Sequence, residues 1–568
     1  MHTLTDLPDA STLAPLPAGQ RIEALDAVRG FALLGICVMN IEFFNRAIST
    51  LGTGMPPGLH GLDWLASYFV AYFVAGKFWT IFSLLFGMGF AVMLTRAETA
   101  GRSFLKPYMR RIAALAVFGA AHHIFLFAGD ILFSYAVAAA YLLVVLYART
   151  GWLLLAIAVA IGVAFVPGAD EAGGAAAFAL AFSGLVALYL RSDKRVFKLS
   201  AAAFGIALLA FVGFVAALVF TFVPGMPEEP RGPIIAGTIL VSVLAVLAQK
   251  FREPIAARPW RAGVGIFMLF ACMQMAGGLY FYFKPVEAPV TAPVAATAPA
   301  KVGADATAKA KAKAVPKTAA EKKAEAAKEK AEGLKKRADR VALEEKVMGR
   351  GSYAELISLR AKHFAKHVAG ESGFATLLIG MFLLGTWFIR SGVMENTGAH
   401  LPLFRKFAFI LLPIGIGMGV AGSFIATSHV PGVDTDGFML ADALHVMGNL
   451  PACLGYVGMI VLMLHSRSVF SRVKVLAPFG RMALTNYLMQ SLVMSLVFLG
   501  HGLAWYGMGR AAQLGFAACL LTGQIVFSHI WLSFFRYGPA EWLWRAITYM
   551  QWPAMRIERA NVAMPAAA

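Results

Sequence analysis

The stretch "RRIAALAVFGAAHHIFLFAGDILFSYAV" (110–137) is apolar enough to lie inside a lipid bilayer. It nevertheless carries two adjacent histidines, His122 and His123, and an aspartate, Asp130. Ionisable side chains inside a membrane are costly, and they usually mark a paired or functional position. The stretch therefore predicts both a membrane-spanning fold and a polar site within it.

The whole chain has the same character. It has 568 residues, of which 59% are hydrophobic and 14% are charged, whereas soluble proteins carry about 25% charged residues. Many apolar runs are long enough to cross a bilayer as helices, and they do not alternate as barrel strands would. The fold class predicted is all-α, a polytopic transmembrane helical bundle.

Hydropathy windows predict about fourteen spans. They are 28–46, 63–94, 110–128, 130–148, 150–167, 174–190, 199–223, 233–250, 262–283, 372–390, 404–428, 438–465, 482–503 and 511–535. The second window is too long for one straight crossing and is interrupted at Gly76-Lys77, which indicates a tilted helix or an interfacial piece followed by a span.

The loops between these windows alternate in charge. The basic loops are 95–111, 191–198, 249–261, 404–406 and 465–481, and the neutral or acidic ones are 168–172, 224–232 and 429–437. The positive-inside rule places the basic loops and both termini in the cytoplasm of a multi-pass protein of the bacterial inner membrane. The net charge of +19 is therefore assigned to orientation in the bilayer, and no nucleic-acid partner is expected.

Residues 285–350 stand apart as a Pro/Ala-rich and then Lys/Glu/Ala-rich segment. We interpret them as an extracytoplasmic loop, a disordered arm that runs into a solvated helix, although a binding role is an open alternative. The predicted division of the chain is a cytoplasmic tail (1–24), an N-terminal membrane part (25–284), this loop, and a C-terminal membrane part (351–568).

Several separated motifs resemble the bacterial YeiB family, whose membrane domain is of unknown function (type 418). They are "LDAVRGFALLGICVMN" (25–40), "GKFWTIFSLLFGMGF" (76–90), "FGAAHHIFLFAGDIL" (118–132), "GRMALTNYLMQS" (480–491) and "YGPAEWLWRAITY" (537–549). His122 stands at the family's His position. The first motif is also similar to that of membrane acyltransferases that act on sugars, such as the heparan glucosaminide acetyltransferases. That resemblance implies transfer of an acyl group from cytoplasmic acyl-coenzyme A, with an intramembrane His taking part.

An α-helix rises about 1.5 Å per residue, and counting along the spans places five polar residues at a comparable depth near the bilayer midplane. They can meet there provided that their helices are neighbours. They are Asn40, His122, His445, Asn486 and Gln490. As a site, His122 would be the general base, and Asn40 and Gln490 would orient substrate or stabilise an oxyanion. The alternative is structural: intramembrane amides often hold helices together, and a histidine can be a satisfied core residue. His123 points about 100° away from His122, and Asp130 is expected to be a helix N-cap.

A second group of candidate residues, all of them charged, is expected near the cytoplasmic ends of the predicted spans. Asp26 and Arg29 begin the first span, Arg481 begins the thirteenth, and Lys77 is placed in the cytoplasmic third of the second. Arg29, Arg481 and Lys77 are candidates to hold coenzyme A phosphates. Lys77 could instead extend to the interface or pair with Asp26.

Two functions remain open. One is an acyl-coenzyme A-dependent acyltransferase that modifies a sugar or envelope acceptor, and the other is a secondary transporter with the same residues around a midplane site. The chain carries no P-loop, H-E-x-x-H, C-x-x-C or G-x-S-x-G motif, so no metal and no permanently bound cofactor are expected. Acyl-coenzyme A would be a co-substrate, and the lipid bilayer is the surrounding partner. The oligomeric state is left open.

Overall fold

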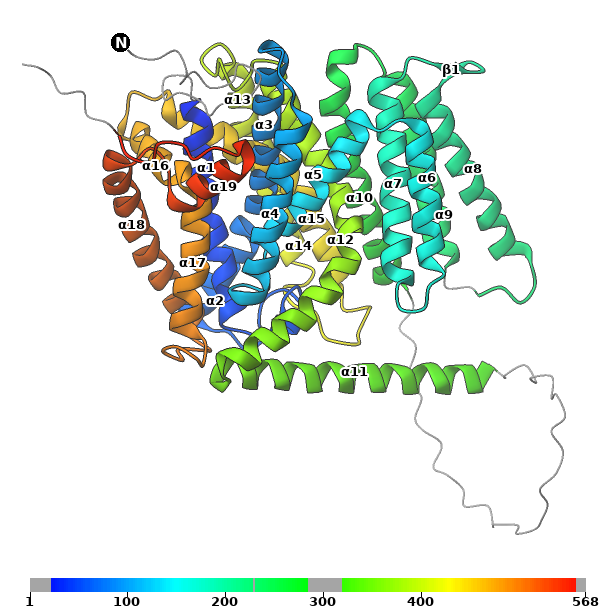
Figure 1. Ribbon diagram of the computed structural model, residues 1–568. Coiled ribbons are helices and arrows are strands. Elements are labelled where there is room, and N and C mark those ends of the chain that lie inside the picture. Colours follow the sequence, from blue (N-terminus) through cyan, green and yellow to red (C-terminus); the bar gives the residue numbers. More distant parts are fainter. Residues whose placement is uncertain (1–21, 228–229, 285–318, 558–568) are drawn as a thin grey trace, which may run out of the picture.

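The computed structural model describes residues 22–227, 230–284 and 319–557. Most of these residues are helical and almost none are in strands, which confirms the predicted all-α fold (Figure 1). The only sheet in the described ranges is a two-stranded hairpin of β1 (Arg195–Val196) and β2 (Leu199–Ser200). The expected tail before residue 22 and the expected Pro/Ala arm over 285–318 lie outside the described residues.

The N-terminal part holds ten α-helices. They are α1 (Glu23–Asn40), α2 (Gly61–Phe69), α3 (Lys77–Thr99), α4 (Leu105–Phe125), α5 (Leu132–Tyr147), α6 (Thr150–Ala164), α7 (Asp170–Arg191), α8 (Ala201–Phe222), α9 (Arg231–Lys250) and α10 (Arg258–Phe283). Short 3₁₀ turns lie at η2 (Ile41–Phe44), η3 (Ile48–Thr50) and η5 (Ile255–Ala257), and η4 (Val70–Val74) is π-helical.

The C-terminal part holds the remaining nine α-helices of the described chain. They are α11 (Ala319–Arg350), α12 (Tyr353–Arg390), α13 (Leu401–Lys406), α14 (Leu412–Ser423), α15 (Phe438–Leu464), α16 (Leu476–Arg481), α17 (Ala483–Phe498), α18 (Arg510–Phe534) and α19 (Pro539–Tyr549). A π-helical turn, η6 (Phe407–Leu411), and a 3₁₀ segment, η7 (Val469–Val475), complete the order.

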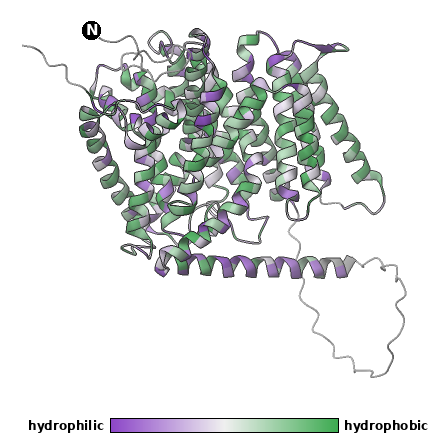
Figure 2. Ribbon diagram, viewed as in Figure 1, coloured by the Kyte–Doolittle hydropathy of each residue, from purple (hydrophilic) through white to green (hydrophobic). Residues whose placement is uncertain are grey.

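Each of the fourteen predicted windows coincides with a helix or a broken pair of helices. Ten helical segments of the described chain are long and apolar enough to cross a membrane by length and composition. Three further apolar helices, α5, α6 and α17, are shorter, with 16, 15 and 16 residues. The apolar character of these helices and the polar character of α11 are visible together in Figure 2.

The bundle has two distinct ends. The turn after α3, the β1–β2 hairpin, α13 and α16 lie at one end, which we call the basic end because it carries the basic loops (Figure 1). The turns after η2, α4, α14 and α17 and the whole of α11 lie at the other, which we call the opposite end. The alternation of loop charge along the sequence thus corresponds to the two ends of one helical bundle.

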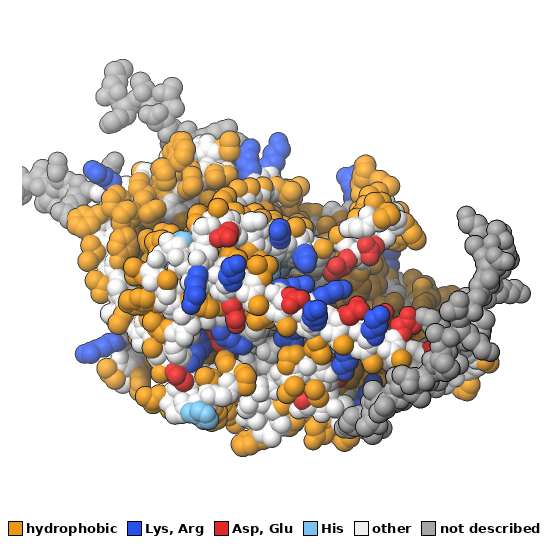
Figure 3. Space-filling model, turned by 90° about the horizontal axis from the view of Figure 1, so that it is seen from below, with side chains coloured by type: hydrophobic (Ala, Val, Ile, Leu, Met, Phe, Trp, Pro, Cys, Tyr) orange, Lys and Arg blue, Asp and Glu red, His pale blue; other side chains and the backbone are white. Residues whose placement is uncertain are grey.

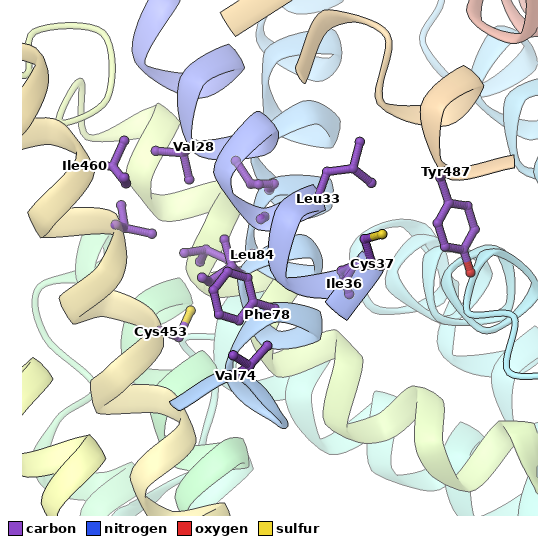
Figure 4. Packing of buried hydrophobic residues seen from close by; sticks show 14 of the residues in the cluster. Val28, Leu33, Ile36, Cys37, Val74, Phe78, Leu84, Cys453, Ile460 and Tyr487 are labelled. Carbon is purple, nitrogen blue, oxygen red and sulfur yellow. The ribbon is translucent and has the colours of Figure 1, made fainter. Parts of the chain in front are cut away.

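The core is built around α1, α3, α12 and α15, so the front and back parts of the chain interleave. Figure 4 shows Val28 of α1 beside Ile460 of α15, whereas Leu33 and Cys37 of α1 point to the side on which Tyr487 lies. Glycines permit direct backbone contact between α3 and α12. A Cβ on Gly87 would lie 2.3 Å from the carbonyl oxygen of Phe382, and one on Gly385 would lie 2.2 Å from that of Leu84. Small residues at helix crossings are the usual means of close packing in membranes.

Helices α6 to α9 form a separate flank (Figure 1). Only 17% and 11% of the most apolar windows of α8 and α9 are buried, against 67% for the first span and 72% for α12. Large apolar side chains on this flank, such as Phe211 and Val246, are therefore exposed to the bilayer rather than packed in the core. The polar sites described below all lie in the core bundle.

Candidate functional site

The buried pair His122–Asp130 is the most distinctive polar feature of the core. Nδ1 of His122 lies 2.7 Å from Oδ1 of Asp130, and neither side chain has any exposed surface. The other ring nitrogen, Nε2, is buried and has no hydrogen-bond partner among the described residues. A carboxylate at Nδ1 keeps the proton there and leaves Nε2 as the basic nitrogen.

The α4–α5 hairpin explains why these two residues meet. His122 lies in the last turn of α4, the chain reverses after Leu126, and Asp130 precedes α5. A Cβ on Gly119 would lie 2.3 Å from the backbone nitrogen of Phe133, so glycine permits the two helices to approach this closely. Oδ2 of Asp130 accepts the N–H of Phe133 in the first turn of α5 at 3.0 Å, although the N-cap residue of α5 is Ile131, one residue after the predicted Asp130.

Aromatic rings enclose the pair. The ring of Tyr487 lies 4.9 Å from that of His122 between centroids, and the ring of Phe127 lies 5.7 Å from it. Figure 4 shows the Tyr487 ring leaving α17 with its hydroxyl directed toward the region of the chain that contains α4 and α5. Tyr487 was not among the predicted site residues, because on α17 it looks like any apolar-face aromatic.

His123 faces elsewhere, as expected from its position. Its ring packs 5.2 Å from the ring of His367 and 5.1 Å from that of Phe364, both on α12. It is 2% exposed, and neither of its ring nitrogens has a partner in the described chain. The two histidines therefore occupy different environments although they are neighbours in sequence.

The predicted position of Lys77 is wrong. It was placed in the cytoplasmic third, but it is the first residue of α3, and the last turn of α3 lies at the basic end. The second window is not one helix. Its first helical segment ends with η4, Gly76 then adopts a φ of +79°, and a new helix, α3, begins at Lys77. Lys77 is fully buried near the opposite end and does not lie beside Asp26.

Lys77 instead contacts His445 of α15. Its Nζ lies 3.2 Å from each ring nitrogen of His445, and Nε2 of that ring lies 3.1 Å from the carbonyl oxygen of Ala75. With Nε2–H donating to Ala75, Nδ1 is free to accept from the Lys77 ammonium. Asp442 stands one turn before His445 and accepts from the amide of Gln274 at 3.1 Å. Asp442 was missed, although its i, i+3 spacing from His445 puts both on one helix face.

The predicted amide side chains of Asn486 and Gln490 form hydrogen bonds between helices and not with His122. Asn486 donates to the carbonyl oxygen of Phe479 at 3.2 Å and to the Ser528 hydroxyl at 2.9 Å. Gln490 donates to Gln524 at 3.0 Å, so both residues hold α17 against α18. Their contacts fit the structural alternative. Asn40 is the last residue of α1 and is 8% exposed.

The basic end carries the remaining predicted residues. Arg29 and Asp26 form an ion pair at 2.8 Å. Asp26 and Arg481 line one open cavity of about 730 Å³, and Nε of Arg481 is buried without a partner in the described chain. The other lining residues are Glu23, Arg472, Lys474, Val475, Ala477, Pro478 and His529. His122 is not among them, so this cavity and the His122–Asp130 pair are separate features.

Glu541 is a further polar residue that the sequence did not indicate. It projects from α19 and accepts the N–H groups of Leu484 and Thr485 at 2.6 and 3.1 Å, together with the Thr485 hydroxyl at 2.5 Å. Burial raises the pKa of this carboxyl above its usual value, although the hydrogen bonds from Thr485 lower it. Glu541 thus caps α17 from a neighbouring helix.

Metal binding finds no support in the described ranges, where no group of three or more His, Cys, Asp or Glu side chains is placed to hold an ion. The arginines near the basic-end cavity suit an anionic group.

Comparison with known proteins shows similarity to a family of unknown function over part of the chain. Residues 388–551 match a family described as "Protein of unknown function (DUF418)". This region contains His445, Arg481, Asn486 and Gln490, but not His122 or Asn40.

Three bacterial relatives are each described as uncharacterized. The YxaH protein of Bacillus subtilis (strain 168) is 25% identical over 549 residues, which cover 95% of this chain and 98% of YxaH. A 39.9 kDa protein from the amylase 3' region of Bacillus acidopullulyticus is 40% identical over 111 residues, 20% of this chain and 30% of that protein. YeiB of Escherichia coli (strain K12) is 33% identical over 171 residues, 30% of this chain and 44% of YeiB. No solved structure matches the chain.

Proposed function

We propose, on the premise that this chain is a polytopic membrane protein of the YeiB and DUF418 family, that it is an acyl-coenzyme A-dependent membrane acyltransferase. Its acceptor would be a sugar or another envelope component. The observation that carries the proposal is the His122–Asp130 pair, in which Nδ1 is bonded to a carboxylate and Nε2 is buried without a partner. A histidine oriented in this way is a suitable general base.

The chemical step follows from this geometry. Nε2 of His122 takes the proton of an acceptor hydroxyl or amine while that oxygen or nitrogen attacks the thioester carbonyl carbon. The bond from carbon to sulfur then breaks, and the coenzyme A thiolate leaves and receives the proton from Nε2. Asp130 stabilises the imidazolium that exists between these two transfers.

A hydrogen-bond donor, such as a side-chain amide, would stabilise the developing oxyanion. Gln490 and Asn486 already donate to α18 and backbone groups, so the proposal assigns this role to Asn40. The neighbourhood supports the assignment, because Phe44, four residues after Asn40, stacks on Phe127 at 5.3 Å and Phe127 lies against His122.

The donor would bind from the basic end. The cavity beside Arg481 offers Arg472 and Lys474 for phosphate groups, and Arg29 lies at the same mouth. His122 is seventeen residues along α4 from Leu105, which corresponds to roughly 25 Å of helix. A donor that carries its thioester on a long, thin arm, as coenzyme A does, suits this separation between the phosphate site and the base.

A transporter is the second candidate, and one observation favours it. Lys77 and His445 lie beside Asp442, which lines a cavity that opens at the opposite end. Buried ionisable groups near a water-accessible cavity are common in secondary transporters. In that case the acyl-coenzyme A experiment below gives no binding, and uptake into proteoliposomes depends on Lys77.

The test is binding and transfer with purified protein in proteoliposomes, using acetyl-coenzyme A labelled in the acetyl group. We expect saturable binding to the wild type. Arg481→Ala should weaken binding at least tenfold, and Arg390→Ala should not, since Arg390 pairs with Glu98 at the same end but outside the cavity. His122→Ala should still bind the donor but transfer no label to added membrane sugars. Failure of the folded wild type to bind acetyl-coenzyme A and longer acyl-coenzyme A donors would overturn the proposal.

A further inference from the structure

A second cavity, which we call the outer cavity, lies at the opposite end of the bundle. It encloses about 250 Å³ among the end of α1, the α2–η4 segment, the turn after α14, the helix α15 and the first residue of α18. Most of its lining is apolar, including Met39, Met55 and Phe438, but three charged residues, Glu42, Asp442 and Arg510, also line it. A cavity of about 150 Å³ holds benzene, so the outer cavity has room for a ligand of amino-acid size.

Arg510 is a buried cation whose bonding capacity is only partly used. It is 5% exposed, and NH1 donates to the side chain of Gln513 at 2.6 Å. NH2 lies 3.4 Å from a carboxylate oxygen of Glu42, but Glu42 also pairs with Arg46 at 2.7 Å. Nε of Arg510 is buried and has no partner among the described residues. A guanidinium in this state is suited to a carboxylate or phosphate group.

Asp442 provides the opposite charge on the cavity wall. One carboxylate oxygen accepts from Gln274, and the group has further acceptor capacity for a hydroxyl or ammonium donor. Lys77 lies behind it and attracts it electrostatically, with His445 between Lys77 and the cavity. Glu42 is paired with Arg46, so Asp442 and Arg510 are the negative and the positive group that remain for a ligand in this largely apolar space.

We propose that the outer cavity binds a small zwitterion with an apolar body. Arg510 would take its anionic group, Asp442 its ammonium group, and the Met and Phe side chains its apolar part. This chemistry occurs both in a free apolar amino acid and in a phosphoethanolamine lipid headgroup. A ligand with only one of the two charges would use only one of these two protein groups and should therefore bind more weakly.

This site is separate from His122. Phe43 lines the outer cavity and packs on Phe127 at 5.3 Å, and Phe127 in turn lies against the His122 ring. Two aromatic rings thus stand between the outer cavity and the proposed general base. The inference does not depend on acyl transfer, and a failed acyl-coenzyme A experiment would leave it intact.

The experiment measures ligand binding to the full chain in phosphatidylglycerol nanodiscs. The probes are tritiated leucine and glycerophosphoethanolamine, with 4-methylpentanoate and 3-methylbutylamine as competitors that each lack one charge. We expect saturable binding of at least one zwitterion, and both single-charge competitors at least tenfold weaker. Competition of leucine by added phosphatidylethanolamine assigns the site to the lipid headgroup, and its absence assigns the site to a free small molecule.

Variants separate binding from folding. Arg510→Leu and Asp442→Asn should each weaken binding at least tenfold, and Arg510→Lys should retain part of it. The matched controls are Arg390→Leu and Asp193→Asn, whose ion pairs with Glu98 and Arg258 lie at the basic end. All variants are compared at equal amounts of monodisperse protein. Absence of binding of both zwitterions to the wild type, equal binding of 4-methylpentanoate, or unchanged binding to both cavity variants would overturn the proposal.

Discussion

Asp130 uses one carboxylate for two purposes, since one oxygen bonds His122 and the other caps α5. The substitution Asp130→Asn retains an oxygen that can accept one of these bonds but removes the charge that stabilises an imidazolium. We therefore expect a small loss of stability and a fall in acyl transfer of about 10²–10⁴-fold, the usual contribution of a general base. Transfer rates and melting temperatures measured on the same preparations check this. Unchanged transfer in a folded Asp130→Asn protein would contradict the assigned role.

His122→Ala should behave differently from His123→Ala. The first leaves the buried Asp130 carboxylate without its partner, so we expect loss of transfer together with a destabilisation of about 1–3 kcal/mol. The ring of His123 has no hydrogen-bond partner among the described residues, so His123→Ala should cost only packing against Phe364 and His367 and should leave transfer per folded molecule intact. Denaturation and transfer assays on both proteins distinguish the outcomes, and equal behaviour of the two variants would remove His122 from the site.

Among the elements, α11 is polar along most of its length but is anchored at one end. Figure 3 views the opposite end and shows Lys, Arg, Asp and Glu side chains side by side across the face where α11 lies. Its last turns are attached to the core through Glu344, which is fully buried. Glu344 accepts the N–H of Ser49 at 2.8 Å and its hydroxyl at 2.7 Å, and it lies 3.1 Å from Nε2 of His363.

The effect of a deletion in this segment on the stability of the core should therefore depend on whether the deletion reaches the last turns of α11. Removing residues 290–330 should leave the melting temperature of the core nearly unchanged, because the described side chains from 324 to 330 are exposed. Glu344→Ala should lower stability by about 1–3 kcal/mol, because buried donors lose their acceptor. Thermal unfolding followed by size-exclusion chromatography measures both. A deletion that unfolds the core, or a neutral Glu344→Ala, would contradict this division of α11.

The attachment of α11 should also depend on pH. Burial by itself raises the pKa of Glu344, but hydrogen bonds from His363 and Ser49 lower it, and the pKa in the folded protein lies below its usual value of about 4.3. The stabilisation is therefore fully present above about pH 4.3 and is lost as the pH falls through the folded pKa. Hydrogen exchange of residues 337–350 should accelerate below about pH 4 relative to neutral pH, after correction for the intrinsic exchange rate. Protection that persists there would show that other contacts hold the helix.

For the whole molecule, the two ends of the bundle give a prediction of orientation. Reporter fusions or single-cysteine labelling should place residues 95–109 and 466–480 in the cytoplasm and residues 319–350 outside. The structure puts the first two segments at one end and α11 at the other, so all three results are linked. Labelling of α11 and of residues 466–480 from the same side would contradict the arrangement of the helices between them.

The sequence by itself determined the fold class, the positions of the membrane helices and the two-sided distribution of charge. These properties depend on local composition, because each apolar run must form a helix to satisfy its backbone in lipid. Even the break at Gly76 was visible in the sequence, since glycine tolerates the positive φ observed there. His122 could be selected as a candidate for the same local reason, as an ionisable residue in an apolar run.

Only the tertiary structure decided which polar residues meet. It joined His122 to Asp130, eight residues away, and Lys77 to His445, 368 residues away, and it turned Asn486 and Gln490 toward α18. The depth estimate for Lys77 failed because it counted depth continuously from the start of the second window, whereas the chain turns at Gly76 and begins α3 anew. Depth along a span follows from counting residues, but a contact between spans depends on how helices pack around one another, and that is set by side-chain shapes and small residues far apart in the sequence.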